Sequence, residues 1–230
     1  LCREQMREAI EDTGAAFHSD IEVETELYEG RSPDLFGAME SLREEFGLQG
    51  ESIILDFATK LKDIQLELTL PGVIRWLRDL RATAVMYCPL QSYEGAYAAQ
   101  VLGIPSVALL TIAGPGGWPR VVGEFISMCG RSQEEVLEMC LSFPPNLEAK
   151  RRMNDRYGLG LSEVEMFEPF GKLESLSRSA VTLVTTCEDL QDPMPEELAA
   201  YYAGLAVRFE ALGPLLDIEG ARRAAGHRFD

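Results

Sequence analysis

Short apolar runs alternate along this chain with longer stretches whose apolar residues recur at helical spacing. Three runs have the length and composition of strands buried in a parallel sheet, namely residues 82–87 (ATAVMY), 104–110 (IPSVALL) and 179–186 (SAVTLVTT). A fourth run, residues 205–212, alternates between apolar and polar positions and predicts another strand. Strands that alternate with helices predict an α/β fold.

Helical patterns fill most of the remaining chain, and glycine follows several of them. Ser32 and Pro33 predict the start of one helix, and Pro71 is expected to divide another stretch into two helices. Residues 15–18 are predicted as a short strand and residues 19–31 as a loop. The predicted helices cover residues 2–13, 32–46, 52–68, 73–80, 93–102, 119–157 with a break near 143–145, and 194–203, with further turns in 162–170.

The segment 82–110 contains a strand, a helix and a second strand joined by short connections. Such a βαβ unit is almost always right-handed, and its two strands are parallel. Together with the later strands it predicts a Rossmann-like, doubly wound parallel sheet with helices on both faces. The sequence shows no internal repeat and no second domain.

The chain is acidic, with a formal net charge of −17 over 230 residues. Nucleic acids and anionic membranes attract basic surfaces, so we expect neither as a partner. No run of about 18 uninterrupted apolar residues occurs, which predicts no transmembrane segment. The five cysteines lack CxxC spacing and only two histidines are present, so we predict no metal site and a reducing, cytoplasmic location.

Three segments carry a resemblance to a known family. Between residues 82 and 118 a strand ends at a polar turn, an alanine-rich helix leads into Leu-Gly-Ile-Pro, and a second strand ends at a loop with a tryptophan. Residues 3–17 (REQMREAIEDTGAAF) and residues 207–217 (VRFEALGPLLD) match in the same order. This set resembles the N-terminal domain of GT-B glycosyltransferases that act on small lipophilic acceptors, including the macrolide and plant-type UDP-glycosyltransferases.

The resemblance implies that residues 1–216 form a partial acceptor-side domain with a GT-B arrangement. Residues 217–230 would be a linker toward a C-terminal donor-binding domain that is absent here. The family's first strand, whose loop carries a catalytic histidine, would precede Leu1, and a sheet without it would expose an edge or leave a gap. The complete enzyme would be a hexosyltransferase that uses a UDP-sugar donor and a small-molecule acceptor, whereas this piece would bind no cofactor and be inactive alone.

Cys88 stands where the family has the carboxylate that orients its catalytic histidine. A thiol cannot stabilise a charged histidine as an aspartate does, so the catalytic residues are unknown from this sequence. His18 follows a different strand and does not replace the missing base. Cys88 is either a nucleophile or, as the usual burial of free cysteine favours, an inert thiol. The alternative to an enzyme is a non-catalytic α/β binding or interaction module, a degenerate relative of the family.

Open parallel sheets bind ligands outside the carboxyl ends of their strands. Here those ends are followed by residues 88–92 and by the glycine-rich segment 111–118 (TIAGPGGW). Polar and aromatic side chains in these segments predict the acceptor-binding residues. They are Gln91, Ser92, Tyr93, Thr111 and Trp118. The alternatives are that the glycines form only a tight turn or a phosphate cradle, the latter disfavoured by Pro115, and that the tryptophan only fills the core.

Overall fold

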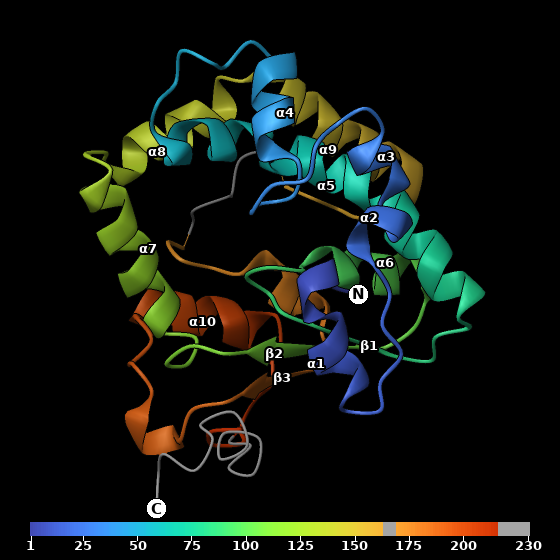
Figure 1. Ribbon diagram of the computed structural model, residues 1–230. Coiled ribbons are helices and arrows are strands. Elements are labelled where there is room, and N and C mark those ends of the chain that lie inside the picture. Colours follow the sequence, from blue (N-terminus) through green and yellow to red (C-terminus); the bar gives the residue numbers. More distant parts are fainter. Residues whose placement is uncertain (163–168, 216–230) are drawn as a thin grey trace, which may run out of the picture.

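Four short strands form one sheet in which all neighbouring strands are parallel (Figure 1). The computed structural model describes residues 1–162 and 169–215. In chain order, which is also their order across the sheet, the strands are β1 (Val85–Tyr87), β2 (Ser106–Leu110), β3 (Val181–Val184) and β4 (Phe209–Ala211). All four lie within the predicted runs, so the parallel α/β sheet expected from the sequence is confirmed.

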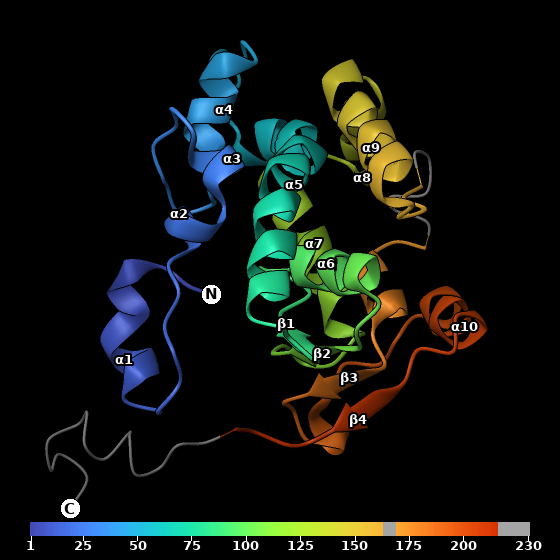
Figure 2. The same cartoon turned by 90° about the vertical axis from the view of Figure 1, so that its right-hand side faces the viewer.

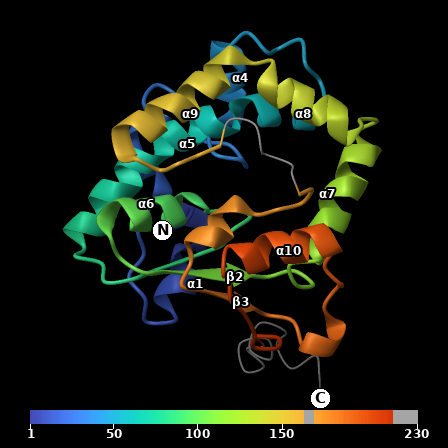
Figure 3. The same cartoon turned by 180° about the vertical axis from the view of Figure 1, so that it is seen from behind.

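One face of the sheet is covered by α6 (Glu94–Leu102) and α10 (Glu196–Gly204), and α10 lies beside β3 in Figures 2 and 3. Small residues let α6 approach the strands closely. A Cβ added to Gly95 would lie 3.0 Å from the Cβ of Tyr87. The helix ends at Gly103, whose φ of 66° is readily adopted by glycine.

The opposite face of the sheet is half-exposed. Residues along β2 and β3 alternate between fully buried and half-buried positions, and Met86 on β1 is 63% exposed. Figure 2 shows α5 and α6 together on one side of the strands. The prediction of helices on both faces is therefore not confirmed by the residues that the structure describes.

The longest element is α5 (Ile54–Asp79), which packs on α6 and on α9 (Pro144–Tyr157). Pro71 lies inside this helix, so the prediction of two separate helices is wrong. Proline in a helix costs about 3 kcal/mol or more. Leu70 and Val73, on either side of it, are buried in one core, and each buried aliphatic side chain contributes about 1.5–3 kcal/mol. Tertiary packing therefore keeps the helix continuous.

The N-terminal half of α5 belongs to a second hydrophobic cluster, which it shares with α3 (Thr25–Tyr28) and α4 (Met39–Glu45). Figure 2 shows α5 between these N-terminal helices on one side and α9 on the other. The buried centre of this cluster contains Leu27, Leu42, Phe57, Leu61 and Ile64.

The N-terminal region differs most from the prediction. A short α1 (Arg7–Glu11) forms within the predicted first helix, but residues 15–18 form no strand. An isolated parallel bridge between Cys2 and Ser19 is the pairing found there. Instead of the predicted loop, α2 (Asp20–Val23) and α3 follow and contact α5. Helices this short are marginal alone, so this packing rather than sequence periodicity stabilises them.

The helix predicted from Ser32 begins later, at Met39. The Asp34 carboxylate accepts hydrogen bonds from the backbone N–H groups of Phe36 at 2.8 Å and Glu40 at 2.7 Å. Asp side chains commonly form such local turns, and this turn holds the preceding residues out of the helix.

The helical region between β2 and β3 contains α7 (Gly117–Met128), α8 (Gln133–Leu141) and α9, with the break before α9 where it was predicted. A capping box joins Ser132 and Glu135 at the start of α8. Short 3-10 helices are η1 (Glu4–Met6), η2 (Glu174–Arg178) and η3 (Glu188–Leu190).

Two predictions fall wholly or partly outside the described ranges. These are the linker at residues 217–230 and most of the turns predicted at 162–170. Within the described ranges, no helix combines the length and the apolar character that crossing a bilayer requires.

Candidate functional site

A cavity of about 820 Å³ lies between α5 and the N-terminal segment, beside β1 at the edge of the sheet. One stripe of α5 forms its longest wall, because residues three and four apart share a helix face. The stripe is apolar at its ends and polar in its middle. It consists of Ala58, Lys62, Gln65, Thr69, Val73 and Trp76.

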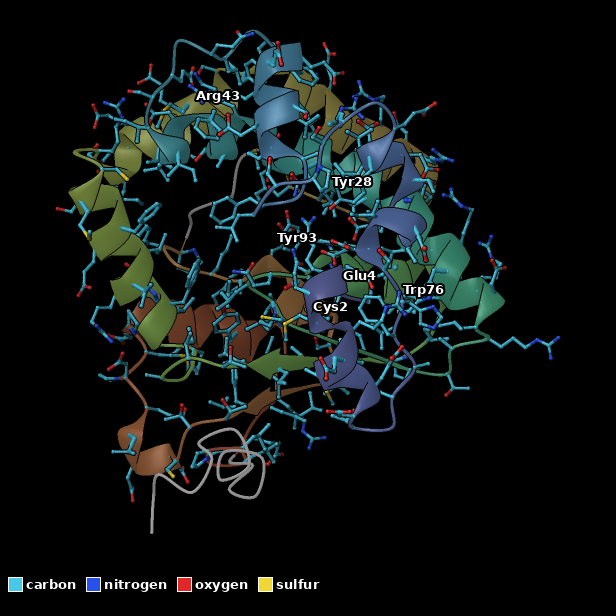
Figure 4. All side chains as sticks on the ribbon, viewed as in Figure 1. Cys2, Glu4, Tyr28, Arg43, Trp76 and Tyr93 are labelled. Atoms are coloured by element: carbon cyan, nitrogen blue, oxygen red, sulfur yellow. The ribbon has the colours of Figure 1, made fainter. Side chains whose placement is uncertain are left out.

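The sheet edge and the N-terminal segment close the cavity. Ala84 and Met86 contribute from the edge of the sheet. Figure 4 labels Tyr93 at the start of α6 and Trp76 on α5 as two further lining residues. The N-terminal segment contributes Cys2, Arg3, Asp20, Glu24 and Tyr28.

Three of the five predicted acceptor-binding residues line this cavity, namely Gln91, Ser92 and Tyr93. Trp118 lines a second cavity of about 170 Å³, to which Tyr93 also contributes. Thr111 is exposed and is not among the lining residues of either cavity. The structure thus brings the loop after β1 to the large cavity, but it does not bring the loop after β2 there.

Lys62, Leu90 and Tyr93 line both cavities, so one layer of side chains separates them. The Lys62 ammonium lies 5.7 Å from the centroid of the Tyr93 ring, within range of a cation–π interaction. Burial raises the pKa of Tyr93 well above its usual value, so its phenol stays neutral. This phenol offers a hydrogen-bond donor and an aromatic face in one place.

The Ser92 hydroxyl also completes the turn after β1, because its oxygen accepts a hydrogen bond of 3.0 Å from the Cys88 backbone N–H. Cys88 is half-buried and is not among the described residues lining either cavity. The nucleophile hypothesis for this thiol therefore gains no support. His18 is half-buried too, and its ring contacts Trp76 edge-on at 5.4 Å between centroids.

The glycines of segment 111–118 pack against residues 191–193. A Cβ on Gly116 would overlap the carbonyl oxygen of Asp192, and Gly114 has a φ of 74°. The glycines are therefore needed for close packing and for the turn, which favours the tight-turn hypothesis over a phosphate cradle.

Glu24 carries an isolated carboxyl group in the cavity wall. The residue is 8% exposed, and no hydrogen bond or ion pair reaches its carboxyl group from the described chain. Burial, reinforced by the negative charges of Glu94 and Asp20 and opposed in part by Arg3, raises the pKa of Glu24 to about 8. The carboxyl group therefore keeps its proton at neutral pH.

Glu94 is the first residue of α6 and lines the same cavity. Burial raises its pKa to about 7, although its own backbone N–H favours the charged form. The carboxyl group is thus balanced between its two protonation states near neutral pH.

Asp20, in contrast, has partners. Its carboxylate forms an ion pair of 2.7 Å with Arg3 and accepts a hydrogen bond of 3.4 Å from the Tyr28 hydroxyl. Arg3 also donates to the backbone carbonyl of Asp34 at 2.9 Å. This network joins the N-terminal residues to the helices that follow. Within it, the positive charge of Arg3 is paired with the carboxylate of Asp20.

Two buried polar atoms of the α5 stripe have no hydrogen-bond partner in the described chain, Oε1 of Gln65 and Nε1 of Trp76. Buried polar atoms are usually paired, so one acceptor and one donor are left for a ligand or for water. Among the described residues, no three His, Cys, Asp or Glu side chains gather as ligands for a metal ion. The cavity suits an apolar molecule that carries several hydrogen-bonding groups.

Sequence reasoning missed the α5 stripe and the N-terminal carboxyl groups. The stripe had a signal, because Lys62, Gln65 and Thr69 are polar residues at helical spacing on one face of a largely apolar helix. No sequence pattern indicated that Glu24 is buried, because its burial depends on the approach of its backbone to Gly72. A Cβ added to Gly72 would lie 3.0 Å from the Cα of Glu24.

Comparisons of the chain with models of protein families, with curated proteins and with solved structures found no match. The geometry and chemistry of the cavity are therefore the basis for assigning a function.

Proposed function

We propose that this chain is the acceptor-binding side of a glycosyltransferase that transfers a sugar from a nucleotide-sugar donor to a small lipophilic acceptor. The position of the large cavity carries this proposal. It adjoins the carboxyl end of β1 in a parallel sheet and is lined by Gln91, Ser92 and Tyr93. Ligands of open parallel sheets bind at such ends.

The size and lining of the cavity support a small-molecule acceptor. Its volume of about 820 Å³ falls within the range of roughly 300–1,000 Å³ typical of ligand sites. Aromatic surface from Tyr28, Trp76 and Tyr93 suits a lipophilic body, and the side chains of Gln91 and Gln65 offer hydrogen bonds to its polar groups.

Glu94 is our candidate for the general base. Transfer to a hydroxyl needs a group that accepts its proton, and a base works best when its pKa lies near the working pH. Burial brings the pKa of Glu94 to about 7, and its side chain lines the cavity. An acceptor hydroxyl within about 3 Å of this carboxylate could lose its proton there.

A non-catalytic binding module is the second candidate. The half-buried Cys88, in the position where the resemblance leads us to expect an aspartate, favours it. Both candidates predict that the cavity binds acceptors, and only the first predicts turnover.

The test is to express the gene that encodes this chain in full and to incubate the product with UDP-glucose and a panel of lipophilic alcohols and phenols. We expect acceptor-dependent release of UDP and a glucoside detected by mass spectrometry. Glu94→Gln should lower kcat by about 100-fold or more, in line with the usual contribution of a general base.

The matched control is Glu196→Gln, because Glu196 is the exposed first residue of another helix. It should leave kcat unchanged. Acceptor binding without any release of UDP would reject the enzyme and favour the binding module. Equal activity of wild type and Glu94→Gln would reject Glu94 as the base.

A further inference from the structure

In the described chain, two carboxyl groups of the cavity wall, those of Glu24 and Glu94, have no ion-pair partner, and Glu24 is the more deeply buried of the two. Asp20 binds Arg3 at 2.7 Å, and Lys62 lies over the Tyr93 ring. Glu24 is more than nine-tenths buried and has no such partner in the described chain. A buried carboxyl group without a partner is unfavourable, and a cation supplied by a ligand would remove that cost.

We propose that the ligand of the large cavity carries a protonated amine and that the Glu24 carboxylate binds this ammonium group as an ion pair. The inference rests on the proposed function only in identifying that ligand with the sugar acceptor. It narrows the acceptor to lipophilic amines, which also carry the hydroxyl group to be glycosylated.

The surroundings of Glu24 suit an ammonium group. Gly72 packs against the backbone of Glu24. Thr69 and Trp76, which lie one turn before and one turn after Gly72 along α5, line the cavity. Tyr28 lies one helical turn after Glu24 and lines the cavity as well. An ammonium group has three donors, and aromatic rings such as those of tyrosine and tryptophan attract cations.

Binding of a cation has a predictable proton balance. Asp20 and Glu94 face Glu24 with negative charge, while Arg3 faces it with positive charge, and burial has the largest effect. The neutral carboxyl group of the free protein must lose its proton to pair with an ammonium ion, and the proton goes to the buffer. Affinity for a cation therefore rises with pH up to about 8.

A neutral ligand would behave in the opposite way. If the protonated carboxyl group of Glu24 donated a hydrogen bond to a ligand hydroxyl, binding would weaken as the pH rose and the donor was lost. The direction of the pH dependence therefore distinguishes the two modes.

The probes are 2-phenylethylamine and its neutral isostere 2-phenylethanol, measured by isothermal titration calorimetry between pH 6 and 8. An alkylammonium ion keeps its proton over this range, as a lysine side chain does. We expect the amine to bind at least 10-fold more tightly than the alcohol at pH 8. Its affinity should rise by up to about 10-fold per pH unit below the pKa of Glu24.

Glu24→Gln should abolish the preference for the amine, remove most of the rise in its affinity above pH 7, the approximate pKa of Glu94, and leave binding of the alcohol unchanged. Glutamine keeps the shape and the neutral state of the protonated acid, so the fold is retained, which circular dichroism checks. Glu22→Gln, at an exposed position of α2 two residues before Glu24, is the matched control and should change neither affinity.

Equal affinity for amine and alcohol at pH 8, a preference that survives in Glu24→Gln, or no binding of either probe would each overturn the proposal. The release of UDP is measured independently of these probes. An enzyme that glycosylates neutral alcohols without preferring amines would retain the proposed function while rejecting the role of Glu24.

Discussion

The two walls of the large cavity are built in different ways. The wall formed by α5, α6 and β1 consists of a long helix, a βαβ unit and a single hydrophobic core. The facing N-terminal wall includes the four-residue helices α2 and α3, which are held by a few contacts. Those contacts include the close approach at Gly72 and a hydrogen-bonded ion pair between Arg75 and Glu26 at 2.7 Å.

The two walls contribute different properties to the cavity. The core wall sets the size of the cavity and supplies most of its aromatic and neutral polar surface. The N-terminal wall supplies Arg3, Asp20 and Glu24, and with them most of the charge. We expect changes in the core wall to alter the stability of the fold, and changes in the N-terminal wall to alter pH dependence and ligand choice.

The largest expected effect concerns pH and Glu24. Its pKa is raised from 4.5 to about 8 on folding, so the unfolded chain loses this proton first and stability falls as pH rises from about 4.5 to 8. The full shift corresponds to roughly 4–5 kcal/mol. Glu24→Gln should remove this contribution to the decrease in the free energy of unfolding, as measured by urea unfolding at pH 5 and pH 9.

Glu22→Gln serves as the control for that experiment and should follow the wild-type pH profile, because Glu22 is exposed. If the unfolding free energy of Glu24→Gln changed with pH as much as that of the wild type, the result would contradict the burial of an isolated carboxyl group at Glu24.

Gly72→Ala should detach the N-terminal wall from the core wall. The added Cβ would overlap the carbonyl oxygen of Val23, and backbone cannot move as a flexible side chain can. We expect a loss of about 1–3 kcal/mol, the usual cost of overpacking, together with loss of ligand binding in the large cavity. Thermal unfolding and calorimetry measure the two effects.

Gly204→Ala is the matched control, because a Cβ at Gly204, the last residue of α10, meets nothing within 4 Å. It should be neutral or slightly stabilising. Unchanged stability and binding in Gly72→Ala would show that the two walls do not depend on this contact.

Asn146→Ala tests the core wall alone. The Asn146 amide accepts from the Asp63 backbone N–H at 2.8 Å and donates to the Asp63 carboxylate at 2.9 Å, joining α9 to α5. Loss of these buried bonds should cost about 1–3 kcal/mol. Because Asn146 does not line the cavity, the pH dependence attributed to Glu24 should persist, and its disappearance would contradict the separation of the walls.

The smallest expected effect is that of Trp118→Ala in the complete protein. Trp118 lines the small cavity, behind the layer formed by Lys62, Leu90 and Tyr93. We expect it to weaken acceptor binding by a few-fold, more than it weakens donor binding, and less than Tyr93→Ala does. Equal effects on donor and acceptor, measured by calorimetry, would reject Trp118 as part of the acceptor site.

Sequence patterns predicted the sheet well and the N-terminal region poorly. Continuous apolar runs located β1, β2 and β3, because strands buried in a parallel sheet are apolar throughout, and the alternation of residues 205–212 located β4. Pro71 was misjudged because local propensity ignores the core on both sides of it. The helices α2 and α3 were missed because they depend on contacts with α5 rather than on periodicity.

For the site, the order of strands and loops in the sequence determined that Gln91, Ser92 and Tyr93 follow a strand of a parallel sheet, and topology then brings them to a ligand-binding end. Only the tertiary structure decided that Thr111 stays outside the cavity and that Glu24 is buried in it. The physical reason is the distance along the chain between the residues that interact. Strand and helix formation follow from neighbouring residues, whereas the burial of a carboxyl group depends on packing between segments far apart in the chain, here Glu24 against Gly72.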